Sequence, residues 1–437
     1  MDGFITRAGE DTPRALLKEA RRLSGKIRGQ LSIDLPAVTD HFSLSSVQAW
    51  RRNGMNHNHP IHQMMPRVGG FPPSLARYFI AAYSEPGEIV FDPYCGKGTV
   101  LFEATRMGRH AFGGDTAPDA VISSRAKCVP VSFSQVANYI QRLPITRTAA
   151  LAGVPSDVKL FYHPDTLRQV LRVRDQLLID LVSSDKRTRD TANFVCGVML
   201  GLLHGHSALA LSLPCNQCFA MSPGYVRRYV REHDLKRPRR DVRQCLMEKA
   251  IKLFPQPRMV GKAKIFQASA EECLRYLRTA KGNVALVITS PPYLDRQTYS
   301  KDAWLRLWFL RCNHREVAKQ SLQTGSVRLF VDAMQKSLDA IMKCIKVGGR
   351  LVLIGGKARV AVGGDVQFVR IIDLCVLALS RINRKPARLS VETVIHDWKV
   401  MNRGSYFAVH RGKSVLKGGG VAPRNGEEDI LIVRKLS

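Results

Sequence analysis

The segment GEIVFDPYCGKGTVLFEATRMGRHAFGGDTAPDA, which starts at Gly87, constrains the fold of this 437-residue chain more than any other. In order, its pattern predicts a strand over 88–91, a glycine loop over 95–98, a helix over 99–107 and a strand over 110–113. A strand that passes through a loop and a helix into a second strand forms a βαβ unit with parallel strands. The sequence therefore predicts an α/β fold.

The glycine loop is predicted to bind a ligand. Gly96 and Gly98 permit positive φ and let backbone amides approach a ligand, while the next helix presents its N-terminus to it. The acid after the second strand, Asp115, is placed to hydrogen-bond a ribose diol. Lys97 is followed by Gly98 rather than by Ser or Thr, so the loop does not match a triphosphate-binding P-loop. These residues favour a nucleoside cofactor.

A second feature is the stretch ALVITSPPYLDRQTY, residues 285–299, in which an apolar strand ends at Ser290, Pro291, Pro292 and Tyr293. Proline fixes φ near −65° and has no amide hydrogen, so two prolines form a stiff segment whose carbonyls lie outside any strand ladder. Such carbonyls are available to a ligand. The alternative is that the prolines only end the strand and the tyrosine packs in the core.

The charge of the chain indicates a polyanionic partner. Lys and Arg number 67 and Asp and Glu 36, which gives a net charge of +31 and a pI near 10.2. Nucleic acid fits this balance best. Charge does not separate DNA from RNA or from an acidic protein, and a generally basic surface is the remaining interpretation.

No secretory signal or membrane span is predicted. The N-terminus is charged and amphipathic, so we expect an intracellular protein, located in the cytoplasm, the nucleoid or the nucleus. The apolar stretch 194–213 contains His204 and His206 and lacks an aromatic belt, so we expect a buried helix there.

The cysteines predict reduced thiols and no metal centre. Ten cysteines are scattered along the chain, as expected of an intracellular protein without disulfides. The one close pair, Cys215 and Cys218, follows the two histidines of the apolar stretch. A single CxxC lacks the second half of a zinc site.

The middle of the chain interrupts the alternation of strands and helices. Residues 132–257 are mostly helical in pattern, with a helix start at Ser222-Pro223. Arginines crowd its last third beside two tyrosines, and the candidates for nucleic-acid contact are Arg227, Arg228, Arg239 and Arg240. A solvated helical face is the alternative.

Alternation then resumes towards the C-terminus. The predicted elements are a strand over 263–268, a helix over 271–278, a strand over 284–288, helices over 301–312 and 331–345, a turn and strand over 347–356, a flexible loop over 414–428 and a last strand over 427–435.

Three ordered motifs resemble those of the exocyclic-amino DNA methyltransferases, specifically the cytosine N4 branch. They are FDPYCGKGT at 91–99, the acid in FGGDTAP at 112–118, and LVITSPPY at 286–293. Residues 59–84 resemble the segment that precedes the first motif, and 304–310 and 345–356 resemble later elements.

The resemblance implies a Rossmann-like class I S-adenosylmethionine-dependent methyltransferase sheet with a helical insertion. It divides the chain into an N-terminal helical, basic extension (1–45), a cofactor half (46–128), a basic insertion (129–262) and a catalytic half (263–437). The insertion is then either a target-recognition domain or accessory structure.

The same resemblance implies S-adenosyl-L-methionine as the cofactor. The residues expected to bind it are Phe91, Asp92, Pro93, Gly96, Gly98, Thr99, Asp115, Ser269 and Pro72. One departure is Gln267-Ala268-Ser269-Ala270, where the family has Gly-Asp-Ala, so Ser269 stands where an aspartate holds the adenine amine.

The catalytic residues that the resemblance implies are Ser290, Pro291, Pro292 and Tyr293. Ser290 and the Pro291 carbonyl would accept the two amine hydrogens of a cytosine flipped out of double-stranded DNA, with Tyr293 stacked on its ring. The product would be N4-methylcytosine, in a restriction-modification setting with a possible cognate restriction enzyme. Adenine N6 methylation, RNA base methylation and a noncatalytic DNA-binding scaffold are the alternatives.

Overall fold

The computed structural model describes residues 12–30, 59–67, 70, 72–145, 149–205, 207–213, 222–254, 260–278, 280–294, 299–322, 324–362, 365–382, 389–397 and 428–437. His206, the pair Cys215 and Cys218, and residues 414–427 of the predicted loop lie outside these ranges.

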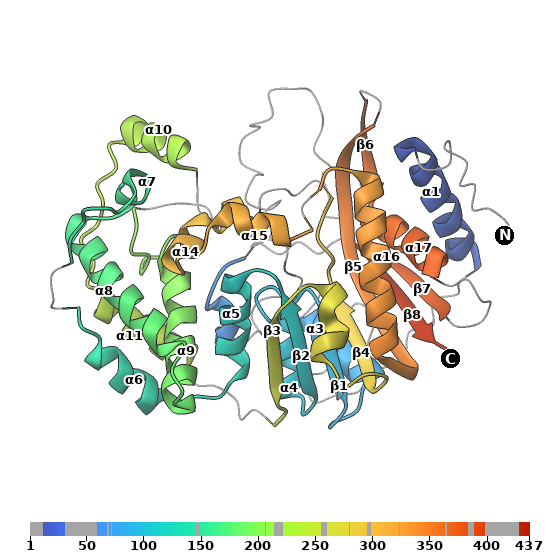
Figure 1. Cartoon of the computed structure of the whole chain (residues 1–437), viewed down its shortest axis with the longest axis horizontal. Helices are drawn as coiled ribbons and strands as arrows, with labels where there is room; N and C mark the ends of the chain where they lie inside the picture. The colour runs from blue at the N-terminus through green and yellow to red at the C-terminus, as the bar shows by residue number, and fades with distance from the viewer. Residues whose placement is uncertain are drawn as a thin grey trace.

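Within the described ranges, eight strands form one sheet (Figure 1). They are β1 (Ile89–Asp92), β2 (His110–Asp115), β3 (Ala263–Gln267), β4 (Val284–Thr289), β5 (Ile345–Val362), β6 (Asp365–Arg370), β7 (Leu389–Asp397) and β8 (Glu428–Lys435). The strand order is β3-β2-β1-β4-β5-β8-β7, and β6 pairs with the outer part of β5. Strands β1 to β5 pair in parallel, whereas β6, β7 and β8 pair antiparallel.

The direction of the winding reverses beside β1. From β1 the chain moves outward through β2 to β3, and it then returns to β4 on the other side of β1. In an open α/β sheet, a ligand crevice lies at such a switch point, outside the carboxyl ends of the strands. The predicted Rossmann-like α/β fold is therefore confirmed.

Helices cover both faces of the sheet because successive strand residues point to opposite faces. Val90 packs into the core beneath α3 (Pro73–Tyr83), α4 (Thr99–Arg106) and α5 (Pro118–Cys128). The next residue, Phe91, packs into the core beneath α16 (Val327–Cys344) and α17 (Ile371–Ile382). On that second face, α1 (Pro13–Gln30) contacts α17 and β7.

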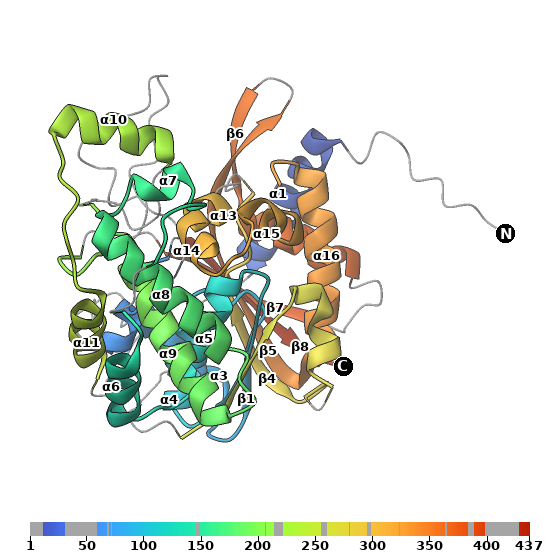
Figure 2. The same ribbon diagram turned by 60° about the vertical axis from the view of Figure 1, so that its left-hand side comes forward.

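The insertion between β2 and β3 is helical, as predicted (Figure 2). It consists of α6 (Phe133–Arg142), α7 (Ser156–Lys159), α8 (Pro164–Asp180), α9 (Lys186–Leu202), α10 (Pro223–His233) and α11 (Val242–Leu253). Helix α10 begins at the predicted cap, where the Ser222 hydroxyl accepts the Tyr225 amide at 3.3 Å. The helix expected in the apolar stretch is α9, which is buried from Thr191 to Leu202 except at Gly201.

Close packing joins the insertion to the segment before β1. A Cβ at Gly201 would lie 1.8 Å from the Met64 carbonyl oxygen, so α9 approaches the turn η2 (Pro60–Gln63) backbone to backbone. Within the described ranges, none of the helices is long and apolar enough to cross a membrane.

The part of the chain after β3 differs locally from the predicted elements. The helix expected over 271–278 is a 3-10 turn, η3 (Ala270–Glu272), followed by α12 (Cys273–Tyr276). The helix expected over 301–312 is split into α13 (Tyr299–Asp302) and α14 (Trp304–Phe309), because Ala303 leaves helical geometry at φ −95° and ψ 4°. The helix α15 (His314–Gln320), which the pattern did not predict, follows.

The turn predicted at 347–349 is a kink within β5. Gly348 has a φ of +80°, and the pairing of β4 with β5 shifts register between Val284 and Leu286. A Cβ at Gly349 would lie 2.9 Å from the Ala285 carbonyl oxygen, so the kink needs a residue without a side chain. Strand β5 then continues into a hairpin with β6 that the sequence did not predict.

Candidate active site

One cavity at the carboxyl ends of β1 and β4 joins the two halves of the chain. Its volume is about 350 Å³. Ten of the predicted site residues line it, namely Asp92, Pro93, Gly96, Thr99, Asp115, Ser269, Ser290, Pro291, Pro292 and Tyr293. Three do not: Phe91 lies in the core, Gly98 lies behind the loop against α5, and Pro72 caps α3.

The glycine loop packs closely against α5. Gly96 and Gly98 have φ values of +50° and +75°, which side chains rarely adopt. The Ser124 hydroxyl donates to the Gly96 carbonyl at 3.1 Å, and a Cβ at Gly98 would lie 2.8 Å from the Ser124 Cα. Any side chain at Gly98 would therefore displace the loop or α5.

Asp115 ends β2 and holds the glycine loop. Its two carboxylate oxygens accept the amides of Gly96 and Ala117, each at 2.9 Å. Burial raises the pKa of Asp115, although Arg67 and the two amides oppose that effect. Since each carboxylate oxygen has two lone pairs, the side chain keeps acceptor capacity towards the cavity.

Arg67 is a lining residue that sequence reasoning did not single out. Its Nη1 lies 2.8 Å from Oδ2 of Asp119, an acid with no exposed side-chain surface. Burial opposes the charged form of Arg67, but the charges of Asp119 and Asp115 outweigh it and raise the pKa of the guanidinium. A permanently charged guanidinium therefore faces the glycine loop inside the cavity.

Asp92 connects the ends of β1 and β4. Its Oδ1 accepts the Thr289 hydroxyl at 2.6 Å and the Tyr94 amide at 3.2 Å. Burial raises the pKa of Asp92 to about 7. Because Thr289 immediately precedes Ser290, this hydrogen bond fixes the start of the Ser-Pro-Pro-Tyr segment relative to the glycine loop. Sequence reasoning named Asp92 but not its partner.

Tyr293 is anchored at its hydroxyl. The Gly356 amide in β5 donates to the Tyr293 Oη at 2.9 Å, and the ring packs against the sheet core on the side of α16. The tyrosine therefore has a fixed position at the wall of the cavity.

Both hydrogen-bond donors of Ser269 take part in a helix cap. Its amide and its hydroxyl both donate to Oε2 of Glu272 at 3.0 Å, in a capping box that opens η3. The neighbouring acid Glu271 lines the cavity. A carboxylate is thus present in the cavity two positions beyond Ser269.

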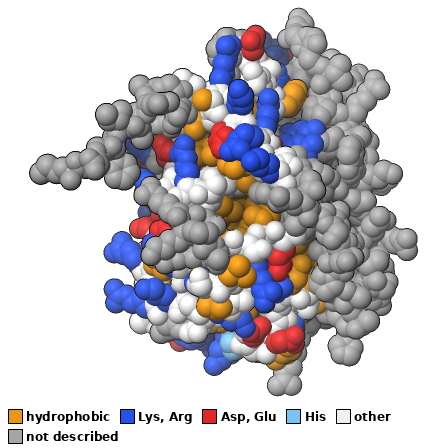
Figure 3. Space-filling model, turned by 90° about the vertical axis from the view of Figure 1, so that its right-hand side faces the viewer, with side chains coloured by type: hydrophobic (Ala, Val, Ile, Leu, Met, Phe, Trp, Pro, Cys, Tyr) orange, Lys and Arg blue, Asp and Glu red, His pale blue; other side chains and the backbone are white. Residues whose placement is uncertain are grey.

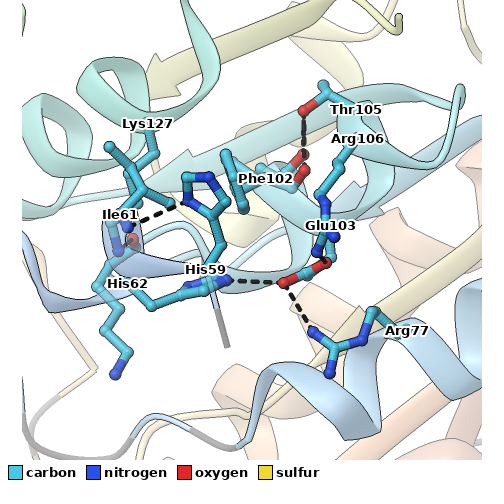
Figure 4. Close-up of polar contacts among 11 residues, drawn as sticks. His59, Ile61, His62, Arg77, Phe102, Glu103, Thr105, Arg106 and Lys127 are labelled. Atoms are coloured by element: carbon cyan, nitrogen blue, oxygen red, sulfur yellow. Dashed lines mark hydrogen bonds and ion pairs between the residues drawn. The ribbon is translucent and has the colours of Figure 1, made fainter. Parts of the chain in front are cut away.

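A buried charged cluster lies behind the loop helix (Figure 4). Glu103 of α4 has no exposed surface, and its Oε1 accepts from Nε2 of His62 at 2.8 Å and from Nη1 of Arg77 at 3.1 Å. Burial lowers the pKa of His62 to about 4, so the imidazole is neutral and donates a hydrogen bond. The cluster joins η2, α3 and α4.

The predicted nucleic-acid residues lie on and after α10. Tyr225 and Tyr229 stack at 5.6 Å between ring centroids, and the Arg228 guanidinium lies 5.5 Å from the Tyr225 ring. Three of the four arginines face acids in ion pairs, namely Arg227 with Asp157, Arg228 with Glu232 and Arg239 with Asp165. The fourth, Arg240, is half-buried, and its backbone hydrogen-bonds Thr166.

No group of three or more His, Cys, Asp or Glu residues is placed to hold a metal ion in the part of the chain that the structure describes. The eight described cysteines are thiols, and seven of them are buried.

Comparison with known proteins gives a partial match to the DNA methylases. A family model for DNA methylases, N6_N4_Mtase, matches residues 17–124. The Type II methyltransferase M.MjaII of Methanocaldococcus jannaschii is 39% identical over 58 residues. That match spans 13% of this chain and 11% of the length of M.MjaII.

Solved structures with similar chains include methylases of DNA and of RNA. A protein of Thermus thermophilus described as a DNA modification methylase, in complex with S-adenosyl-L-methionine, is 19% identical, with a TM-score of 0.23, over 39% of this chain and 54% of that one. An rRNA methylase of Streptococcus thermophilus is 9% identical, with a TM-score of 0.29, over 87% of this chain and 98% of that one. At such scores, the fold assignment rests on this chain's own strand order.

The fold is a Rossmann-like α/β sheet with a helical insertion. The similarity to DNA methylases is limited to the match over residues 17–124 and to the short match to M.MjaII.

Proposed function

We propose that this chain is an S-adenosylmethionine-dependent methyltransferase that modifies an exocyclic amine in double-stranded DNA, with cytosine N4 as its target. One observation carries the proposal: the glycine loop and the Ser-Pro-Pro-Tyr segment, about 190 positions apart, line a single cavity. The match to a DNA methylase model supports the substrate class.

The residues of the cavity fit the cofactor. Gly96 brings backbone without a side chain to the cavity, Asp115 offers acceptor capacity for a ribose diol, and Arg67 supplies positive charge for a carboxylate. Glu271 is the acid available to accept an adenine amine where Ser269 is used by the cap. When bound, S-adenosylmethionine supplies an electrophilic methyl group.

The chain's own residues would activate the amine. The lone pair of a cytosine N4 is delocalised into the ring, so the amine is a poor nucleophile until it is pulled out of conjugation. The Ser290 hydroxyl and the Pro291 carbonyl would accept hydrogen bonds from its two N–H groups, and Pro292 keeps that carbonyl in place. The nitrogen would take the methyl group and release one proton to solvent. Tyr293 would stack on the flipped base. Catalysis then consists of positioning and electrostatics.

The nearest alternative is methylation of adenine N6, because the matching family model covers both N6 and N4 methylases. Serine rather than an acid or amide before Pro-Pro-Tyr favours cytosine. Incubation with labelled S-adenosylmethionine and genomic DNA, followed by mass spectrometry of the nucleosides, tests the assignment. N6-methyladenine as the sole product would refute the cytosine target.

Replacement of Asp115 with Ala is expected to weaken cofactor binding by about 1.5 to 3 kcal/mol, because a hydrogen bond from a ribose hydroxyl to a carboxylate is lost. The same change also releases the Gly96 amide that Asp115 holds. Calorimetric titration with S-adenosylmethionine measures the change. Asp157→Ala, at an exposed acid of the insertion, is the control, and equal affinities for the two variants would contradict the ribose assignment.

The arginines around α10 are expected to contact DNA phosphates. On binding, these arginines would leave their ion pairs with Asp157, Glu232 and Asp165 and contact phosphates instead. Each such contact releases counterions from the DNA. Removal of Arg227, Arg228 and Arg239 together should lower the slope of log affinity against log salt by about 0.9 per contact. The slope comes from anisotropy titrations at several salt concentrations, and an unaltered slope would identify a solvated face.

Two expectations from the sequence remain predictions. One is the division of the chain into four regions, and the other is the existence of a cognate restriction endonuclease.

A further inference from the structure

The hairpin of β5 and β6 is an arm on the cavity side of the sheet. Strand β5 runs parallel to β4 and pairs with its last residue, Thr289, at Leu353. It then continues to Val362 and turns back as β6, so the hairpin extends from the edge of the sheet at which the cavity opens. Its outer part, 357–362, spans about 20 Å. Figures 1 and 2 show it projecting beyond the other strands.

One face of this arm is occupied by the protein itself. Residues directly opposite in an antiparallel pair share a face. Ala358 with Val369 and Val360 with Gln367 form the inner face, whose apolar members are at most 3% exposed. Helix α1 lies on this side, where Arg21 donates to the Gln367 side chain at 3.5 Å.

The other face of the arm is basic and apolar. Its outer part is exposed, whereas Lys357 and Arg370 at its base are half-buried, and Arg370 pairs with Asp429. Its cross-strand pairs are Lys357 with Arg370, Arg359 with Phe368, and Ala361 with Val366. Phe368 and Val366 are 45% and 56% exposed, and Arg359 is also exposed. An exposed strand pair that combines large apolar side chains with positive charge is typical of a contact surface rather than of a solvated edge.

Further positive charge flanks the arm. Helix α1 carries Arg14, Lys18, Arg21 and Arg22 beside the inner face. On the side of the molecule that includes α1, Lys and Arg side chains gather in the upper part of the view (Figure 3). Two of these basic residues, Arg14 and Arg22, pair with Asp365 and Glu19, and the remaining positive charge suits a polyanionic partner.

The base of the arm touches the candidate catalytic segment. Gly356, the residue before Lys357, donates its amide to the Tyr293 hydroxyl at 2.9 Å. This hydrogen bond joins the base of the arm directly to the candidate active site.

We propose that the outer face of the β5–β6 arm binds double-stranded DNA beside the cavity, with Arg359 on the phosphate backbone and Phe368 against the nucleotides that flank the target base. This inference rests on the proposed function and deepens it, because it places DNA on a surface of the catalytic half as well as on the insertion. Arginine and an exposed aromatic ring are the side chains that phosphates and unstacked bases favour.

The test compares an arm variant with a matched variant elsewhere. The double variant Arg359→Ala/Phe368→Ala is titrated against a fluorescent duplex of random sequence, beside Lys186→Ala/Val182→Ala. The control also removes one basic and one apolar exposed side chain, since Lys186 and Val182 are 77% and 81% exposed. We expect at least tenfold weaker binding for the arm variant and unchanged binding for the control.

Thermal unfolding checks that each variant is folded. A second measurement, which does not depend on weakened binding, places p-benzoylphenylalanine at position 368. Light-induced crosslinking to the duplex at position 368, but not at Val182, supports the proposal. Equal affinities of arm variant and wild type, no crosslink, or no binding of the duplex by wild type would each overturn it. Methylation is assayed separately: an arm-dependent DNA binder that transfers no methyl group would refute the proposed function and leave the arm proposal standing.

Discussion

Replacement of Ser290 with Ala is expected to lower kcat for methyl transfer on the order of 100-fold or more, while the affinities for cofactor and DNA stay close to wild type. Ser290 lines the cavity directly after Thr289, whose hydrogen bond to Asp92 holds the segment in place. Its acceptance of an amine hydrogen matters most as the amine leaves conjugation, so its loss raises the barrier to transfer more than it weakens binding.

Single-turnover rates with labelled S-adenosylmethionine measure the effect. Ser300→Ala is the control, because this buried serine lines the same cavity but lies outside the Ser-Pro-Pro-Tyr segment. A Ser290→Ala variant with full activity would refute the role of the hydroxyl. A parallel loss of cofactor affinity would mean that the serine shapes the cavity instead of acting on the amine.

The second large effect is expected on stability. Replacement of Glu103 with Ala should lower the free energy of unfolding by about 3 to 5 kcal/mol, because it leaves the charge of buried Arg77 without its carboxylate. Arg77 is 3% exposed and lies 3.1 Å from Glu103, and His62 and Arg106 contact the same acid. Burial alone would raise the pKa of Glu103, but these partners hold it below its usual value.

Urea denaturation of Glu103→Ala and of Glu316→Ala measures the difference. Glu316 forms an exposed ion pair with Lys319 at 2.9 Å, and such a pair contributes about 0 to 1 kcal/mol. Equal losses of unfolding free energy in the two variants would show that the buried cluster contributes no more to stability than an exposed ion pair. Because Glu103 lies in the helix that follows the glycine loop, we also expect weaker cofactor binding in its variant.

Local patterns were sufficient to predict the elements around the site. The strand before Asp92, the loop at Gly96 and Gly98 and the strand before Ser290 each combine hydrophobic alternation with residues that end an element for steric reasons. The end-of-strand positions then follow from the geometry of a parallel sheet. For this reason, most predicted residues reach one cavity although their roles stay predictions.

Residues that act through distant partners could not be predicted in this way. Arg67 faces the glycine loop through an ion pair with Asp119, 52 positions later, and Thr289 reaches Asp92 across 197 positions. Glu271 enters the cavity only because Ser269 opens a short 3-10 turn rather than a full helix. The arm was missed because its alternation of basic and apolar residues is short and follows a strand that looked complete at Gly356.

The place of the insertion determines when the site is assembled during synthesis. Strands β2 and β3 are neighbours in the sheet, yet Asp115 and its partner Gln267 are about 150 positions apart. Strand β8, which lies between β5 and β7, is at the very end of the described chain. Pairings this distant in sequence form late and slow folding. During synthesis the glycine loop would therefore emerge long before Ser290, so the cavity cannot assemble until β4 has joined the sheet, and the incomplete sheet edges need protection until then.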